Sequence, residues 1–233
     1  MLDELKNRLE ALSNPIKAKE QQRYFKTGQG EYGEGDHFLG IRVPVLRQMA
    51  KEYAELELDD TLQLLQSNIH EQRFVALVLL VQRFCKADSL GRSELYELYC
   101  ANTAWINNWD LVDSSAPHIV GAYLFERDKG PLFKLACSSS LWERRIALLA
   151  TFHFIRNNIF TPTLQIAETL INDPEDLIHK GVGWMLREVG KRNLALEEEF
   201  LVKYYQGMPR VMLRYAIEKM EEPKRKMYLR GEV

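Results

Sequence analysis

The sequence has few cysteines, no long apolar run and no excess of charge of either sign. Its 233 residues include three cysteines, an odd number spaced too widely for a disulfide framework or a zinc knuckle, so a reducing compartment is expected. The longest apolar run, residues 74–81, is far too short to span a bilayer. The first residues alternate charge with leucine and do not resemble a signal peptide. These absences predict a cytoplasmic protein without a membrane segment.

The balance of charges excludes a general attraction to polyanions. Thirty-one Lys and Arg stand against 33 Asp and Glu, which gives a formal net charge of −2. Any nucleic acid would therefore have to bind to a local basic patch. The hydrophobic content of 46% and charged content of 27% are typical of a folded globular chain. The five histidines show no metal-ligand spacing and no nucleophile motif occurs, so neither a metal nor a cofactor is expected.

A glycine-rich segment at residues 27–40 contains GQGEYG at residues 28–33, which has the glycine spacing of a dinucleotide-binding fingerprint. That fingerprint needs a strand before it and a helix after it, whereas this segment follows a predicted helix. Glu31, Glu34 and Asp36 would also repel phosphates. The segment is therefore predicted to be a flexible loop and not a nucleotide site.

Apolar residues recur at helical spacing along nearly all of the remaining chain, and no convincing strand pattern occurs. Leucines follow this spacing in the first twelve residues. Asn14-Pro15 then provides the N-cap and first-turn proline of a second helix that runs to about Phe25. Residues 70–85 are apolar on most of their circumference, which is typical of a central helix. These patterns predict an all-α fold.

A weak internal repeat indicates how the helices are arranged. Ala76, Ala147, Gly183 and Ala216 lie 71, 36 and 33 residues apart, and each follows a nearby cation. A period of about 35 to 40 residues is typical of a HEAT-like α-solenoid, a right-handed superhelical array of antiparallel helix pairs with a concave binding face. We therefore expect one HEAT-like domain over residues 1–233, with N-terminal helices at 1–26, the glycine-rich loop at 27–40 and helical repeats at 43–230.

The stretch from Asn108 to Pro117 places a tryptophan beside two acids. If it is helical, Trp109 and Asp113 share one face, and an indole beside a carboxylate can hold a cation. A plainer alternative is that Asp113 or Ser114 caps a helix that begins near Ala116-Pro117, with Trp109 filling the core. The sequence around residues 108–117 leaves both interpretations open.

The repeat register adds further polar residues to this stretch. Trp109 and Asp113, Arg144 or Arg145, and Trp184 with Arg187 and Lys191 fall on equivalent helices of three successive repeats. Equivalent helices of a solenoid line one face, so these side chains are expected to converge. The alternative is that they are solvated charges and buried indoles.

Three segments, taken in order and spacing, resemble the AlkD-type DNA alkylation-repair glycosylases. They are Trp109-Asp-Leu-Val-Asp113, Trp142-Glu-Arg-Arg145-Ile-Ala, and Gly181-Val-Gly-Trp184-Met-Leu-Arg187-Glu-Val-Gly-Lys191. Arg23-Tyr24 and residues 38–44 resemble the same family, so the resemblance covers most of the chain. The loop at residues 27–36 looks longer than is usual for that family.

The resemblance implies a role for each matching position. Asp113 corresponds to the catalytic carboxylate, Trp109 and Trp184 to the aromatic pair that flanks the lesion, and Arg145 to the cleft arginine. Tyr24 corresponds to an aromatic residue near the nucleotide. The basic lining that holds the DNA backbone corresponds to Arg47, Arg187, Lys191 and Arg214.

The implied activity is hydrolysis of the N-glycosidic bond of cationic alkylated purines, of the 3-methyladenine or 7-methylguanine type, in duplex DNA. The implied enzyme is a monofunctional glycosylase of base excision repair that acts as a monomer without a cofactor. The alternative is a non-catalytic repeat module that binds DNA structure or a protein partner. Because a carboxylate weakens binding in a phosphate-binding groove, Asp113 argues for chemistry.

Overall fold

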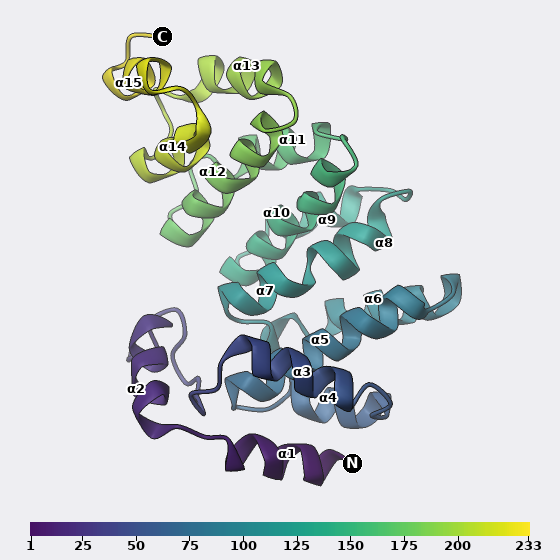
Figure 1. Cartoon of the computed structure of the whole chain (residues 1–233). Helices are drawn as coiled ribbons and strands as arrows, with labels where there is room; N and C mark the ends of the chain where they lie inside the picture. Colours follow the sequence, from purple (N-terminus) through teal and green to yellow (C-terminus); the bar gives the residue numbers. More distant parts are fainter. The chain divides into compact units, whose positions relative to one another are not determined.

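The protein is built from helices and connecting loops, as its computed structural model shows for all of residues 1–233 (Figure 1). Its one strand-like contact is an isolated parallel bridge between His37 and Ile69. The predicted all-α class is confirmed. None of the helices combines the length and the apolar character that a membrane span requires.

The chain divides into two compact units, residues 1–115 and residues 116–233, called here the first and the second unit. The helices of the first unit are α1 (Leu2–Ala11), α2 (Pro15–Tyr24), α3 (Val43–Glu52), α4 (Leu58–Leu65), α5 (His70–Lys86), α6 (Ser89–Ala101), η1 (Thr103–Trp105) and α7 (Trp109–Ser115). Those of the second unit are η2 (Pro117–Gly121), α8 (Ala122–Leu124), α9 (Gly130–Ala136), α10 (Leu141–Arg156), α11 (Thr161–Thr169), α12 (Asp176–Gly190), α13 (Leu194–Tyr204), α14 (Arg210–Ala216), η3 (Ile217–Lys219) and α15 (Glu222–Arg230). The single HEAT-like solenoid over residues 1–233 stays a prediction.

Helix α5 is the centre of the first unit, as the apolar pattern at residues 70–85 predicts. It packs against α3, α4 and α7, and Figure 1 shows α3 and α4 gathered around it. Residues 70–80 are all buried. The first four of them are polar, and buried polar groups destabilise a fold unless they find partners. The start of α5 therefore requires a set of polar partners from other segments.

Helix α2 begins and ends where the sequence predicts. The side chain of Asn14 accepts a hydrogen bond from the Lys17 N–H at 3.0 Å, and Pro15 occupies the first turn. The helix ends at Tyr24, one residue before the predicted end. The glycine-rich loop that follows contains no helix or extended strand before α3.

The alternative of a capped helix near Ala116 is only partly right, because η2 begins at Pro117 but has no side-chain cap. Ala116 has helical backbone angles of φ −56° and ψ −43°, and no side chain caps the residues that follow it. The Ser114 hydroxyl donates to the Leu111 carbonyl oxygen one turn earlier, at 3.2 Å. The backbone stays helical here through a wide turn, in which the Gly121 N–H donates to the carbonyl oxygen of Ala116, five residues earlier, at 2.9 Å. Pro117 fits this turn because it has no N–H group that would need a partner.

The repeated cations have equivalent surroundings in the two units. Arg73 donates to the backbone carbonyl six residues before it at 2.9 Å and pairs with Asp36 at 2.7 Å. Arg144 donates to the backbone carbonyl six residues before it at 3.0 Å and pairs with Asp173 at 2.6 Å. The sequence repeat therefore marks a recurring structural anchor at the start of a buried helix.

The small residues of the repeat lie where helices approach each other closely. Ala76 and Ala147 are fully buried. A Cβ atom on Gly183 would clash with the Met212 carbonyl oxygen and lie 2.5 Å from the Cβ of Tyr215. Only glycine permits this approach of α12 to α14.

Candidate active site

Trp109, the first residue of α7, ends a stack of four rings in the first unit. Its ring lies 5.1 Å from that of Phe25, at an interplanar angle of 13°. Phe25 stacks on Phe38 at 4.9 Å and 21°, and Phe38 stacks on the His70 ring at 4.4 Å and 21°. Phe25 also contacts the His70 ring directly, at 5.2 Å and a tilt of 39°. Trp109 is only half-buried, so part of the indole remains open to solvent. The plain reading of Trp109 as a core residue is thus partly right, because it packs against a buried cluster that includes Phe25 and Phe38.

A buried charge network connects the far end of this stack back to Trp109. His70 Nδ1 lies 3.3 Å from Asp36 Oδ2, and His70 Nε2 lies 2.8 Å from Asp110 Oδ2. Asp36 also pairs with Arg73, and the side chains of Asp36, His70 and Arg73 are all at most 3% exposed. Because Asp110 follows Trp109 directly in the chain, His70 is connected to this part of α7 twice, through the aromatic rings and through its hydrogen bond with Asp110.

The charges in this network stabilise one another. Burial lowers the pKa of His70, but Asp110 and Asp36 outweigh it and raise the pKa above its usual value. Burial raises the pKa of Asp36, but hydrogen bonding from His70 and the charge of Arg73 lower it overall. An imidazole donates from both nitrogens only when it is protonated, and here each nitrogen faces a carboxylate oxygen. The arrangement therefore fits an imidazolium.

Tyr24 stands beside the solvent-facing end of the stack. It contacts Phe25 edge-on at 5.2 Å and Trp109 edge-on at 6.0 Å. With 66% of its surface exposed, it is available to a ligand that approaches Trp109. Two of the residues singled out from the sequence, Tyr24 and Trp109, thus lie in direct contact.

Asp113 lies one helical turn after Trp109 on α7 and is half-buried, so the two share one helix face as predicted. Burial raises the pKa of the nearby Tyr99 hydroxyl, and the Asp113 carboxylate adds to that rise. Tyr99 also shares a hydrogen bond of 2.9 Å with the Ser115 hydroxyl. These contacts anchor the end of α7 within the first unit.

In the second unit, Arg145 and Trp184 lie on α10 and α12. Arg145 is 5% exposed, and its Nη1 donates to the Leu177 carbonyl oxygen at 2.6 Å, which ties α10 to the start of α12. Trp184 is half-buried and lies 5.8 Å from the Phe152 ring. The roles of Arg145 as cleft arginine and of Trp184 as lesion-flanking aromatic stay predictions.

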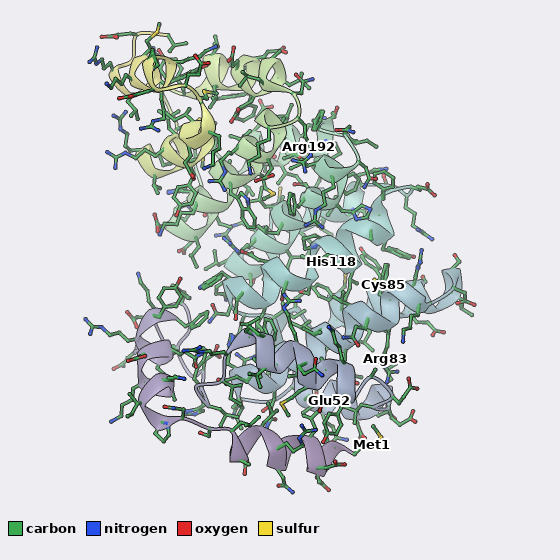
Figure 2. The ribbon with its side chains drawn as sticks, viewed as in Figure 1. Met1, Glu52, Arg83, Cys85, His118 and Arg192 are labelled. Carbon is green, nitrogen blue, oxygen red and sulfur yellow. The ribbon has the colours of Figure 1, made fainter.

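Trp184, Arg187 and Lys191 are spaced three and four residues apart, so Lys191, the C-cap residue of α12, continues the helix face that carries Trp184 and Arg187. Both cations on this face already have carboxylate partners. Arg187 pairs with Glu218, and Lys191 pairs with Glu188 at 2.5 Å. Arg192, which is labelled in Figure 2, pairs with Glu188 as well, at 3.2 Å.

The other two predicted basic residues have no carboxylate partner. Arg214 on α14 is exposed and forms no ion pair. Arg47 on α3 is also exposed, and its guanidinium lies 5.6 Å from the centre of the Phe74 ring. Both guanidinium groups are therefore free to meet an anion.

The predicted residues fall into two sets. The first unit holds Tyr24, Arg47, Trp109 and Asp113, and the second holds Arg145, Trp184, Arg187, Lys191 and Arg214. Each set has the local geometry described above. Their convergence on one surface stays a prediction.

Comparison with known proteins agrees with the resemblance. The family model described as DNA alkylation repair enzyme matches residues 5–220. The chain belongs to the DNA alkylation repair enzyme family. A solved structure described as a predicted DNA alkylation repair enzyme from Enterococcus faecalis is similar, with a TM-score of 0.68 and 18% sequence identity over 90% of this chain and 97% of that chain. At this identity the likeness supports the fold alone. No curated protein sequence matches the chain.

Sequence reasoning about this DNA alkylation repair family member missed Asp36, His70 and Glu71. Asp36 counted only as a charge that repels phosphates, and His70 only as a histidine without metal-ligand spacing. Glu71 is 1% exposed and accepts hydrogen bonds from the backbone N–H groups of residues 39–41 at 2.8 to 3.2 Å, which holds the segment after Phe38. The available signal was the run of four polar residues that opens an otherwise apolar helix.

No group of three or more His, Cys, Asp or Glu side chains is placed to hold a metal ion.

The second unit also has a cavity of about 420 Å³, lined in part by Arg187 and Lys191. Glu197 on α13 contributes to it, is 3% exposed, and has an Oε1 atom without a hydrogen-bond partner. Its carboxyl group packs so closely on Gly190 that a Cβ atom there would clash. Burial raises the pKa of Glu197 to about 8, the charge of Glu198 adds to the rise, and Arg187 opposes it. Glu197 is therefore mostly neutral at pH 7.

Replacing Glu197 with glutamine should stabilise this protein at high pH. Folding raises the Glu197 pKa from 4.5 to about 8. The effect of Glu197 on the free energy of unfolding is therefore absent below about pH 4.5, destabilises the protein increasingly from pH 4.5 to about pH 8, and stays constant above that. Glu197→Gln removes that destabilisation, so the gain in unfolding free energy should be near zero at pH 4 and on the order of a few kcal/mol at pH 9. Urea unfolding at both pH values measures it, with exposed Glu199→Gln on the same helix as the control. An equal gain at both pH values would contradict the assignment of a buried neutral acid.

Proposed function

We propose that this protein is a monofunctional DNA glycosylase that hydrolyses the N-glycosidic bond of cationic alkylated purines, of the 3-methyladenine or 7-methylguanine type, in duplex DNA. The observation that carries the proposal is the pair on α7, a partly exposed indole at Trp109 and a carboxylate at Asp113 one turn later, in a chain of the DNA alkylation repair enzyme family. The proposal includes action as a monomer in the cytoplasm.

The chemistry needs few groups because the substrate is already activated. A purine alkylated at N3 or N7 carries a positive charge, so the bond between C1′ and the base nitrogen can break with its electron pair leaving on a neutral base. A general acid is therefore unnecessary. The sugar develops oxocarbenium character, and water adds to C1′ and loses a proton. In this scheme Asp113 stabilises the positive sugar and orients the water, as carboxylates do in glycoside hydrolysis.

The aromatic residues supply selectivity for charge. An indole face attracts a cation by about 0.5–2 kcal/mol, and it offers a neutral base no such gain. Tyr24, exposed and in contact with Trp109, extends the aromatic surface on the first unit. Under the proposal Trp184 supplies the second indole and Arg145 lines the cleft, as the family resemblance implies.

Binding to the DNA backbone is assigned to Arg47, Arg187, Lys191 and Arg214, because a net charge of −2 leaves only a local patch for this task. These four are not equivalent. Arg187 and Lys191 would have to exchange a carboxylate partner for a phosphate. Arg47 and Arg214 have none to exchange, so they should contribute more binding free energy per contact.

The substitution Asp113→Asn tests the proposed chemistry, because it keeps the shape of the side chain and removes its charge. Release of 7-methylguanine from methylated duplex DNA should fall by at least about 100-fold, the usual cost of losing one electrostatic contact to the transition state. Affinity for the duplex should hold or rise slightly, because a negative charge near the phosphates is lost. Single-turnover kinetics and fluorescence anisotropy measure the two quantities.

The control for Asp113→Asn is Asp59→Asn, which removes an equal charge from an exposed position on α4. It should leave base release unchanged. If Asp113→Asn releases base at the wild-type rate, Asp113 has no role in the chemistry. If the wild type releases no base yet binds duplex DNA, the protein is a binding module.

The substitution Arg214→Gln tests the assignment of the backbone contacts. Loss of one phosphate contact should reduce the slope of log affinity against log salt by about 0.9. Exposed Arg225 on α15 also has no carboxylate partner, so Arg225→Gln is a control with the same change in net charge. Equal slopes for the two variants would place the DNA away from α14.

A further inference from the structure

We infer that His70 is a positioning residue: clamped between Asp36 and Asp110, it holds the aromatic stack that ends at Trp109. The inference rests on the proposed function for the reaction that Trp109 would serve. The geometry that supports it is independent of that reaction. His70 itself is 3% exposed and lies at the buried end of the stack, so it touches no substrate.

Two separate routes connect His70 to Trp109. One runs through Phe25, whose ring lies 5.2 Å from the His70 ring and 5.1 Å from the Trp109 ring, with Phe38 packed against both Phe25 and His70 at 4.9 and 4.4 Å. The other runs through the hydrogen bond of 2.8 Å from His70 Nε2 to Asp110, the residue after Trp109. A shift of the imidazole would therefore move both the surface on which Trp109 packs and the backbone that carries it.

The place of Trp109 at the start of a helix makes these contacts decisive for where it lies. Trp109 is the first residue of α7, so its backbone N–H has no partner within the helix. Contacts with side chains outside the helix therefore determine the position of this end. The contacts at its start are the Asp110 carboxylate on His70 and the Asn108 side chain, whose Oδ1 accepts from the Trp109 N–H at 2.9 Å and whose Nδ2 lies 3.5 Å from Asp36.

The clamp depends on the charge of His70. The charged groups that face it are Asp36 from the loop before α3, Asp110 from α7 and Arg73 from its own helix, while the adjacent Glu71 directs its carboxylate to the backbone of residues 39–41. An imidazolium donates to both carboxylates, whereas a neutral imidazole donates to one and leaves the other without this donor. Deprotonation would therefore remove one of the two hydrogen bonds that His70 donates to Asp36 and Asp110.

The direction of the pH effect follows from the raised pKa of His70. Its contribution is fully present below pH 6.5, the usual pKa, and is lost as the pH rises through the higher pKa of the folded state. The position of Trp109 should therefore change as the pH rises above 6.5. Asp36, whose pKa is lowered, keeps its charge throughout that range.

The direct test is fluorine NMR of the full chain labelled with 5-fluorotryptophan. Its four tryptophans give four resonances, and Trp109→Phe assigns the relevant one. We expect the Trp109 resonance of the wild type to titrate with a midpoint above pH 6.5, and this titration to disappear in His70→Gln. The matched control is His37→Gln, an exposed histidine one residue before Phe38, which should titrate like the wild type.

A second variant keeps the test valid if His70→Gln does not fold. Asp110→Asn can donate its amide to a neutral His70 Nε2, so the fold is retained without an imidazolium. We expect the midpoint of the Trp109 resonance to move to lower pH in Asp110→Asn. A resonance that does not titrate in the wild type, or that titrates identically in Asp110→Asn, would overturn the inference.

Base release separates this inference from the proposed function. With alkylated duplex DNA, His70→Gln should reduce release by at least tenfold while DNA affinity stays within twofold of the wild type. If the wild type releases no base but the Trp109 resonance follows His70 as described, the proposed function is wrong and the positioning role stands. If base is released at the same rate by His70→Gln and the wild type, the positioning role is wrong.

Discussion

The interaction on which the first unit depends most is the buried imidazolium of His70 between Asp36 and Asp110. It joins three segments that lie far apart in the chain: the end of the glycine-rich loop, the start of α5 and the start of α7. Removing charges from water costs several kcal/mol per ion, so such a group stabilises the fold only with a full set of partners. Loss of a single partner typically costs about 3–5 kcal/mol, because it leaves an uncompensated buried charge. The three segments are therefore held together or released together, and the aromatic stack that carries Trp109 depends on them.

The second unit uses a related anchor without a histidine. Arg144 repeats the contacts of Arg73, a backbone carbonyl six residues earlier and an aspartate from another segment. The third copy departs from this pattern, because Lys180 pairs with Asp176 on its own helix at 2.6 Å. The sequence repeat is thus strongest where a buried helix begins with a cation, and that cation is structural in both of the first two copies. Arg73 and Arg144 are consequently poor candidates for binding DNA.

Local features of the sequence predict the local features of the fold. The helical spacing of apolar residues predicts the all-α class, and the Asn14-Pro15 cap predicts the start of α2, because both depend on neighbouring residues. The cap alternative at Ser114 fails because the backbone stays helical through Pro117, which a cap rule does not anticipate. The contacts of His70 join residues 34 and 40 positions away, so no periodic pattern reports them. The only signal was the polar start of α5, which indicates that partners exist but not which ones. The spacing of Trp109 and Asp113 predicts a shared helix face correctly, while convergence with Arg145 and Trp184 depends on how the units are arranged.

Under the proposed function, the aromatic surface at Trp109 and the Asp113 carboxylate act on a base that is already positively charged. The most direct test measures free base released by the wild-type protein from two duplexes that are identical except for the lesion, 7-methylguanine in one and uracil in the other. Under the proposed function, 7-methylguanine should be released well above the rate without protein, and uracil no faster than that background. Equal release of the cationic and the neutral base would contradict it.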